Sequence, residues 1–315
     1  MRLALAGDAM LGRGVAQTLS SRPSPALFAA EIVEETRAAD LCVLNLECCI
    51  SERGEPWPAR TFHFRAPPAA AEALADLGVD CVTLANNHAL DFGPRALLDT
   101  LAHLARVGVA CVGAGAGLEE ARAPAVLEAG GVRCGVLGVT DHPREYAAAP
   151  DRPGVAFADL SRGAPDWLLE SIRHADGEVV LVTPHWGPNM IQEPVQAVRV
   201  AGPALLEAGA TLVAGHSAHV FHGVAGRILY DLGDFIDDYR VDPVLRNDLG
   251  LLWLIDLEAG RPARLELLPL KLDYCHTSPA TGEDAAWIRR RFRAACAALG
   301  TEVAEEGGRL VIWLD

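Results

Sequence analysis

Between residues 3 and 234 the chain alternates short apolar runs with longer amphipathic stretches. The apolar runs carry few charges and break at Gly or at polar residues, which is typical of strands covered on both faces. This pattern predicts strands at 3–8, 41–47, 81–88, 110–115, 134–141, 179–186, 211–219 and 227–234. Between them it predicts helices, among others at 25–39, 94–108 and 194–209. Strand–helix alternation of this length indicates an α/β fold.

Cap residues support these helices. Ser24 before Pro25 is a typical N-terminal cap, with Pro at the first helical position. Gly108 and Gly209 stand where helix C-caps are expected.

The pattern changes after Asp248. Two alternating stretches, 249–258 and 263–273, flank a Gly-Arg-Pro turn and predict an antiparallel hairpin. A helix at 284–300 and a last strand at 309–314 follow, so the sheet should be mixed. We expect a single domain over residues 1–315, with its chemistry in residues 1–240 and the hairpin, helix and strand in 249–315.

Composition narrows the possible partners. Half of the 315 residues are apolar, which is ample for a packed core, and the net charge of −15 argues against nucleic acid or an anionic membrane as a partner. The N-terminal apolar run is too short for a signal peptide, and no run reaches membrane-spanning length. The eight cysteines form no CxxC pair. We therefore expect that the thiols are free, that the protein is cytoplasmic and that it has no membrane span.

Ligand-type side chains gather at the predicted strand ends. Binding sites in α/β sheets form at the carboxyl edge, where loops and helix N-termini converge. The side chains at this edge are Asp8, Asn45, Glu47, Asn86, Asn87, His88, His185, His216 and His219. Carboxylate, amide and imidazole groups of this kind predict a metal site assembled from distant strands.

These motifs also resemble a known family. Gly7-Asp8, Asn45-Leu46-Glu47, Asn86-Asn87-His88 with Asp91, His185-Trp186-Gly187 and Gly215-His216-Ser217-Ala218-His219 look like the CapA family of poly-γ-glutamate capsule proteins, within the calcineurin-like metallophosphatase superfamily. The resemblance covers residues 3 to about 240. It implies a four-layer metallophosphatase-like sandwich, with two packed mixed β-sheets flanked by helices and metal at the strand ends.

The resemblance also implies roles for single residues. Asp8, Glu47 and His219 would form a first metal site, with Glu47 bridging to a second site. The second site would take its remaining ligands from Asn87, His185 and His216.

One position departs from the superfamily pattern. Met10 stands where the superfamily has a His ligand, and a thioether is a poor ligand for a hard or borderline cation. We therefore expect one divalent metal ion, which could be Mn, Zn, Fe, Mg or Ca, held by Glu47, Asn87, His185 and His216.

The resemblance also implies that His88 is the general acid, and its place after two Asn residues at a strand end supports a catalytic role. Asp91, three residues on, would orient its ring and support its charge. His222 has no counterpart in the pattern and is interpreted as structural, and His142 is interpreted as non-catalytic. An acidic turn containing Asp231, Asp234 and Asp237 would either support the site from outside or only solvate the surface. Contacts with a small-molecule or peptide substrate are expected from Arg13, Arg65, Asn45 and Trp186.

Three functions fit these residues. The first is a metal-dependent hydrolase acting on a phosphoester or on a γ-glutamyl or peptide amide, with His88 protonating the leaving group. The second is a metal-assisted peptide epimerase that uses two pairs, His88/Asp91 and His219/Asp8. The third is a non-enzymatic accessory role in capsule synthesis. The sequence carries no signal for an oligomeric state.

Overall fold

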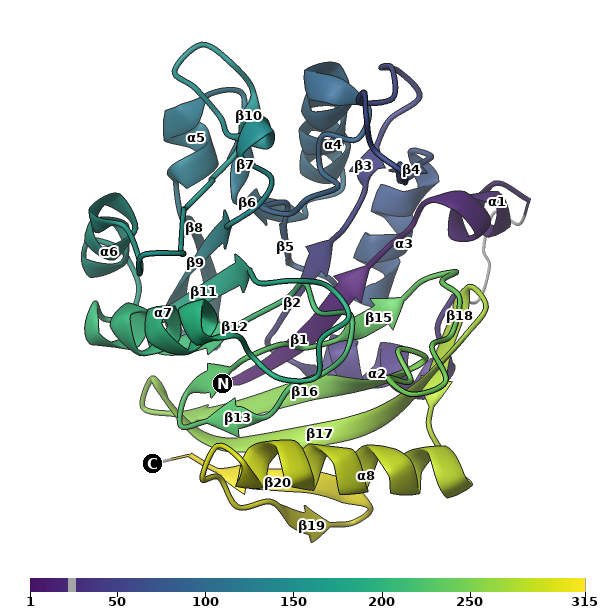
Figure 1. The fold of residues 1–315 in the computed structure, drawn as a ribbon, viewed down its shortest axis with the longest axis vertical. Coiled ribbons are helices and arrows are strands. Elements are labelled where there is room, and N and C mark those ends of the chain that lie inside the picture. The colour runs from purple at the N-terminus through teal and green to yellow at the C-terminus, as the bar shows by residue number, and fades with distance from the viewer. Residues whose placement is uncertain (22–26, 315) are drawn as a thin grey trace.

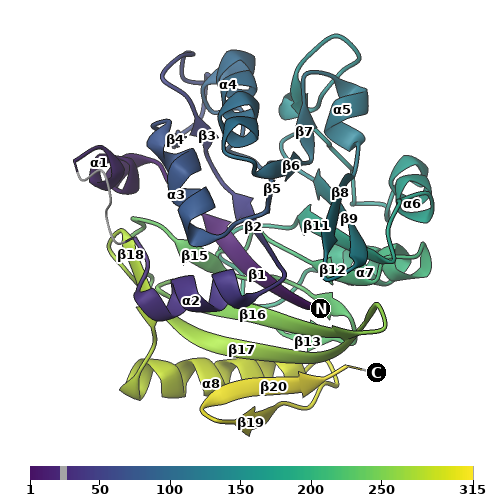
Figure 2. The same ribbon diagram turned by 180° about the vertical axis from the view of Figure 1, so that it is seen from behind.

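The computed structural model describes residues 1–21 and 27–314, and it places two large β-sheets face to face with helices on their outer sides (Figure 1, Figure 2). The larger sheet is 10-stranded, with β15 (Asp234–Ile236) paired to β1 and β18 (His276–Pro279) paired to β17. The order of its other strands is β19 (Ala304–Glu306), β20 (Arg309–Trp313), β17 (Arg261–Asp273), β16 (Leu249–Glu258), β1 (Arg2–Ala9), β2 (Leu41–Leu46), β5 (Cys81–Thr83) and β6 (Ala110–Val112).

The smaller sheet has six strands. Their order is β13 (Val224–Ala225), β14 (Ile228–Leu229), β12 (Leu212–Ala214), β11 (Val179–His185), β9 (Val132–Thr140) and β8 (Ala125–Ala129). Two short ribbons are formed by β3 (Cys49–Ile50) with β4 (Arg65–Ala66), and by β7 (Ala114–Gly115) with β10 (Gly154–Val155).

Alternation along the central strands explains the layers. In β1, Leu3 and Leu5 join the core between the two sheets, whereas Ala4 and Ala6 join the core under the helices of the larger sheet. The strands β2 and β11 divide their side chains between two cores in the same way. Side chains of a strand point alternately to opposite faces, so an almost wholly apolar strand is stable only where both faces are covered.

The helices provide the outer layers. The larger sheet is covered by α1 (Arg13–Ser21), α2 (Ala30–Ala38), α3 (Ala69–Leu77) and α4 (Gly93–Arg106), and the smaller sheet by α6 (Asp166–Arg173) and α7 (Gln196–Glu207). Two short elements, α5 (Leu118–Arg122) and the 3₁₀ turn Arg144–Tyr146, lie in the connections. The long α8 (Gly282–Ala297) buries Ile288, Phe292 and Cys296 in the core between the sheets. The expected four-layer fold of two mixed sheets flanked by helices is confirmed.

Parallel pairing brings the strand ends together. The order β1–β2–β5–β6 is parallel throughout, as is β9–β11–β12–β14 in the other sheet. The carboxyl ends of these strands therefore share one edge in each sheet, and the two edges meet around the polar cluster described below.

Four expected strands are shorter than the apolar pattern suggested. The run 211–219 is a strand only over Leu212–Ala214, and 110–115 divides into β6 and β7. The run 81–88 is a strand only to Thr83, because the side chain of Asn86 turns back to donate to the carbonyl oxygen of Leu46 at 2.8 Å. The run 227–234 divides into β14 and β15, and Gly233 between them has a φ of 77°. Polar side chains that bond locally compete with the strand ladder, and hydrophobic patterning does not register this competition.

The start of one helix and the turn of the hairpin differ from the pattern, whereas the ends of two other helices match it. The helix expected at 25–39 begins at Ala30, while its expected cap at Ser24 and Pro25 lies outside the described residues. The hairpin turn lies at Ala259 and Gly260, with φ of 48° and 77°, and not at Gly-Arg-Pro, because this turn needs positive φ that proline cannot adopt. Gly108 and Gly209 do follow α4 and α7 with positive φ, as expected for helix ends.

Within the described chain, no helix combines the length and the apolar character that crossing a membrane requires. All eight cysteines are free thiols, and seven of them are buried.

Candidate active site

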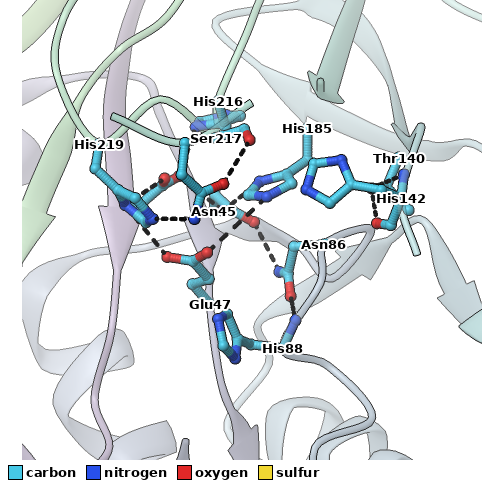
Figure 3. Close-up of polar contacts among 12 residues, drawn as sticks. Asn45, Glu47, Asn86, His88, Thr140, His142, His185, His216, Ser217 and His219 are labelled. Carbon is cyan, nitrogen blue, oxygen red and sulfur yellow. Dashed lines mark hydrogen bonds and ion pairs between the residues drawn. The ribbon is translucent and has the colours of Figure 1, made fainter. Parts of the chain in front are cut away.

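The predicted site residues gather where the two sheets meet. Asp8 ends β1, Asn45 lies in β2 with Glu47 just after it, His185 ends β11, and His216 and His219 follow β12. All six side chains are buried, and Figure 3 shows those it labels converging from both sheets. His216 and His219 come from the cluster of three histidines between residues 216 and 222, and that cluster therefore forms one wall of a site built by distant strands.

The most compact group of potential ligands contains one residue that the sequence analysis did not assign to the metal. Asp8, Glu47, His219 and Asp234 each offer one ligand atom, and these atoms all lie within 4.8 Å of one another. The Nδ1 atom of His219 lies 2.8 Å from Oδ1 of Asp234, 3.5 Å from Oδ2 of Asp8 and 3.8 Å from Oε2 of Glu47. Asp234 thus lies with the residues expected to form the first metal site. It adds a ligand-type group to that site, where Met10 replaces a His ligand.

A local repeat in the sequence signals this role for Asp234. Leu232-Gly233-Asp234 repeats the apolar-Gly-Asp pattern of Ala6-Gly7-Asp8, and β15 pairs in parallel with β1 so that Asp234 stands beside Asp8. The pairing joins strands more than 200 residues apart in the chain, so the pattern alone did not reveal it.

A second group lies on the other side of Glu47. The Oε1 atom of Glu47 is 3.9 Å from Nε2 of His185. The Nδ1 atom of His216 is 3.3 Å from Oδ1 of Asp8. Asn45 donates to Oδ1 of Asp8 at 2.7 Å and so fixes that carboxylate against β2. Asn86 donates to Oδ1 of Asn45 at 2.9 Å and thereby joins β5 to the same network.

Unpaired polar atoms test whether these residues fit a metal ion. Buried polar atoms without hydrogen-bond partners are rare in folded proteins. Here the buried unpaired atoms include Asp8 Oδ2, both carboxylate oxygens of Glu47, Asn87 Oδ1, His185 Nε2, His216 Nδ1 and Asp234 Oδ2. All are oxygen or nitrogen atoms of ligand type, and those of Asp8, Glu47, His185, His216 and Asp234 belong to the two groups around Glu47. The residues present therefore fit a divalent cation.

Two of the three carboxyl groups, those of Glu47 and Asp234, lack sufficient positive charge around them. Burial raises the pKa of Glu47 and the pKa of Asp234 well above their ordinary values. Burial would also raise the pKa of Asp8, but the neighbouring His216, His185 and His219 outweigh it and hold that pKa below its usual range. A bound cation would supply the positive charge that Glu47 and Asp234 lack in this buried cluster.

The imidazoles differ in their environments. Burial lowers the pKa of His185 well below its ordinary value, which keeps the ring neutral and available as a ligand. Burial also lowers the pKa of His219, but the charges of Glu47 and Asp8 outweigh it and raise that pKa.

His88 has an environment of its own beside this cluster. Its Nδ1 atom lies 2.6 Å from Oδ2 of Asp91. Asp91 is held in turn by the backbone N–H of Phe64 at 2.7 Å, the hydroxyl of Tyr146 at 3.1 Å and the guanidinium of Arg60 at 3.5 Å. Burial lowers the pKa of His88 although Asp91 raises it, so Nδ1–H donates to Asp91 while Nε2 is left to exchange a proton. Tyr146 and Arg60 reach Asp91 from loops, and sequence patterning did not single them out.

The expected substrate contacts lie in varied surroundings. Asn45 is buried within the network around Asp8. Trp186 is buried in the core of the smaller sheet, where its Nε1 donates to the carbonyl of Tyr230 at 2.9 Å. Arg13 pairs with Asp238 and lies 5.0 Å from the ring centroid of Phe64, and Arg65 lies 4.1 Å from that of Phe92.

Three other residues complete the surroundings. His142 is partly exposed beside the site, with its ring 5.3 Å from that of His185 (Figure 3). His222 is buried outside the cluster, and its Nε2 lies 3.0 Å from the carbonyl oxygen of Ile191. Met10 is buried in the core under the helices, and its sulfur accepts the backbone N–H of Gly12 at 3.1 Å.

The four-layer α/β sandwich, with buried carboxylates and imidazoles at its strand ends, is a fold of the metallophosphatase-like kind. Within that class, the chain belongs to the family of bacterial capsule synthesis proteins PGA_cap, whose model matches residues 2–239. The resemblance seen in the sequence motifs is thereby confirmed.

Known proteins similar to the chain agree with this family. A probable polyglutamine synthesis accessory protein of Mycobacterium tuberculosis is 31% identical, over 98% of this chain and 94% of its own length. The PGA biosynthesis protein CapA of Bacillus subtilis is 30% identical, over 87% of this chain and 72% of its own length. A crystal structure of a hypothetical protein from Thermus thermophilus matches with a TM-score of 0.50 and 20% identity, over 86% of this chain and 99% of that one, which is a likeness of fold.

Proposed function

We propose that this protein is a metal-dependent hydrolase that cleaves an amide bond of a glutamyl-type peptide or polymer. The observation that carries the proposal is the set of unpaired buried ligand atoms around Glu47, next to a His–Asp pair that is not part of that set. The substrate class follows from the names of the similar proteins, which concern polyglutamine and PGA synthesis.

Two metal positions are supported by the side chains. Asp8, Glu47, His219 and Asp234 would hold a cation in the compact group, and Glu47, Asn87, His185 and His216 would hold one in the neighbouring group. A cation in either position would supply Lewis-acid polarisation of the scissile group and make a nucleophile available at neutral pH.

The chain's own groups would perform the proton transfer. Neutral His88 would accept through Nε2 the proton of the attacking water, while its Nδ1–H keeps its hydrogen bond to Asp91, and that carboxylate would stabilise the imidazolium. The same Nε2–H would then be donated to the leaving amine. Asp91 is thus a positioning residue, held by three separate donors.

The epimerase alternative receives less support from the geometry. It requires His219 to pair with Asp8 outside the metal group, but the short contact of His219 is with Asp234, at 2.8 Å, and its contact with Asp8 is 3.5 Å. His88 with Asp91 would then be the one intact pair. The accessory role receives support only from the name of the Mycobacterium tuberculosis relative.

Metal content separates ligands from nearby histidines. We expect His216→Ala to lose most of its bound manganese or zinc and His222→Ala to keep it. The unpaired Nδ1 of His216 lies 3.3 Å from Oδ1 of Asp8 in the cluster, whereas His222 lies outside the cluster with its Nε2 at the carbonyl of Ile191. Metal is measured on purified, folded variants by plasma mass spectrometry. Equal loss of metal from both variants would contradict the assignment of the site.

Turnover is measured with γ-linked and α-linked glutamate tetramers in deuterated water, and with an aryl phosphate. New amino termini from a tetramer support the proposal. Release of phosphate alone would show that the protein hydrolyses a phosphoester and not an amide. Deuterium at Cα without cleavage would establish epimerisation, and inertness of the metal-loaded protein would favour the accessory role.

A further inference from the structure

A second cavity lies apart from the strand-end cluster, between α8 and the segment that leads into α7. Its volume is about 410 Å³, and its charged and aromatic lining consists of Glu193, Arg199, Trp287, Arg290 and Arg291. None of these residues belongs to the candidate active site.

The cavity concentrates positive charge in a chain whose net charge is −15. Three arginines line it against one carboxylate, Glu193, which lies 3.4 Å from Arg199 and has a side chain that is 73% exposed. Such an exposed pair neutralises little of the positive charge.

Arg291 is partly buried and, unlike Arg199, has no carboxylate beside it among the described residues. Its guanidinium carbon lies 5.5 Å from the ring centroids of both Phe221 and Trp287. Its Nε and Nη2 atoms are buried without a hydrogen-bond partner, and within the described ranges no carboxylate comes into ion-pair distance of it. Half-burial of a guanidinium without an anion carries a desolvation cost, so a bound anion would stabilise Arg291.

The other walls of the cavity are apolar. They are formed by Pro194, Ala294, Ala298 and Leu299, together with the indole of Trp287. A bare inorganic anion would leave these surfaces uncovered, whereas an anion with an aliphatic body would cover them while its carboxylate meets the arginines.

One segment connects this cavity to the active site. Residues 186–195 follow His185, and Nδ2 of Asn189 lies 3.3 Å from Nε2 of His219. His222 holds the segment at Ile191, and Gln192 already lines the cavity. Three residues of chain span at most about 10 Å. A peptide whose scissile bond lies at the strand-end cluster could therefore place a neighbouring side chain in the cavity.

We propose that the cavity between α8 and residues 192–199 is a binding subsite for a carboxylate side chain of a peptide or polymer substrate. The glutamyl identity of that substrate rests on the proposed function, but the recognition of a carboxylate by Arg290, Arg291 and Arg199 does not. Binding of such a ligand needs no turnover.

The test measures binding by the full chain in EDTA, so that no hydrolysis occurs. The probes are a γ-linked glutamate tetramer, a glutamine tetramer and inorganic phosphate, monitored by calorimetry and by the fluorescence of the tryptophans, which include Trp287. We expect the glutamate tetramer to bind more tightly than either of the others. Arg290→Gln and Arg291→Gln should each weaken it about 10-fold or more, on the usual scale for a hydrogen bond to a charged group.

Arg293→Gln is the matched control, because Arg293 lies on the same helix but pairs with Glu305 at 2.9 Å, outside the cavity. Arg290 is exposed, so its variant tests the proposal even if Arg291→Gln does not fold. Equal weakening in Arg293→Gln, equally tight binding of phosphate, or no binding of the glutamate tetramer would each overturn the proposal. If binding depended on the arginines but the metal-loaded protein cleaved nothing, the proposed hydrolase function would be wrong and the proposed carboxylate subsite would stand.

Discussion

At the scale of single residues, Asn87 and His88 have different expected roles. Asn87 is a candidate metal ligand, and His88 is the candidate acid–base group. Asn87 has a buried Oδ1 atom without a hydrogen-bond partner, whereas His88 is hydrogen-bonded to Asp91 through Nδ1. The two adjacent side chains thus differ in whether they are already paired. The division can be tested because each side chain can be removed separately.

We expect His88→Ala to keep its metal and its fold and to lose activity by roughly 10²-fold or more, the usual scale for a lost acid–base group. The activity of Asp91→Asn should lie between that of His88→Ala and that of the wild type, because the imidazole ring remains but its charge partner is lost. Metal content and turnover are measured on the same preparations. If His88→Ala lost metal in proportion to activity, His88 would be a ligand.

His222 makes the stability of the protein depend on pH. Burial lowers its folded-state pKa to about 4, whereas the unfolded ring titrates near 6.5. Between these values the unfolded chain binds more protons, so the contribution of neutral His222 is complete above about pH 6.5 and is lost as the pH falls to about 4. The loss amounts to about 3 kcal/mol.

We therefore expect His222→Gln to flatten the decline of the unfolding free energy between pH 6.5 and 4, relative to the wild type. An amide can still donate to the carbonyl of Ile191, as the ring does now. Urea unfolding at a series of pH values measures this. Parallel curves for both proteins would show that His222 titrates normally.

At the scale of elements, the pairing of β15 with β1 brings Asp234 to Asp8. The backbone N–H of Asp8 donates to the carbonyl of Gly233 at 2.9 Å, and this close approach needs a residue without Cβ at position 7. A Cβ built on Gly7 would lie 1.7 Å from the oxygen of Gly233. The geometry of the candidate metal group thus depends on a glycine that carries no ligand.

Gly7→Ala should therefore push β15 away from β1, reduce the stability by about 1–3 kcal/mol and lower the metal content together with it. Gly202→Ala in α7 is the control, because there the nearest atoms are side-chain atoms of Ile228 at 3.1 Å, which can yield. Thermal unfolding and metal analysis are compared for both variants. A Gly7→Ala protein with normal stability and metal would contradict this account of the strand pairing.

At the scale of the whole molecule, the candidate ligands join the two sheets. Asp8, Glu47 and Asp234 belong to the larger sheet and its edge, and His185, His216 and His219 to the smaller one. A cation held by both sets would link the sheets across their shared edge and would relieve the repulsion among the buried carboxylates.

We expect manganese or zinc at about 100 times its dissociation constant to stabilise the protein by about 2.7 kcal/mol, seen as a rise of several degrees in Tm. Glu47→Gln should abolish most of this rise. It should also leave the metal-free protein no less stable than the wild type, because one of the repelling carboxyl groups is gone. Scanning calorimetry with and without EDTA measures both effects. A metal-induced rise unchanged in Glu47→Gln would place the ion elsewhere.

The periodicity of the sequence determined the layers and the edge at which the site lies. Runs such as 3–8 and 179–186 are apolar at nearly every position, so they had to be strands covered on both faces, and the polar residues that end them had to meet at the carboxyl edge. Asp8, Glu47, His185, His216 and His219 could therefore be selected without coordinates. These features depend on local order along the chain.

Only the tertiary structure decided which of these groups stand in contact, and with which others. Asp234 joins Asp8 through a parallel pairing between the beginning of the chain and a strand more than 200 residues later. Tyr146 and Arg60 reach Asp91 from the connections between elements, and the arginines of α8 line one cavity with residues 192–199 although the two segments are far apart in the sequence. Hydrophobic periodicity records which face of an element is buried, but not which distant element covers it, because many partners would bury the same apolar area equally well.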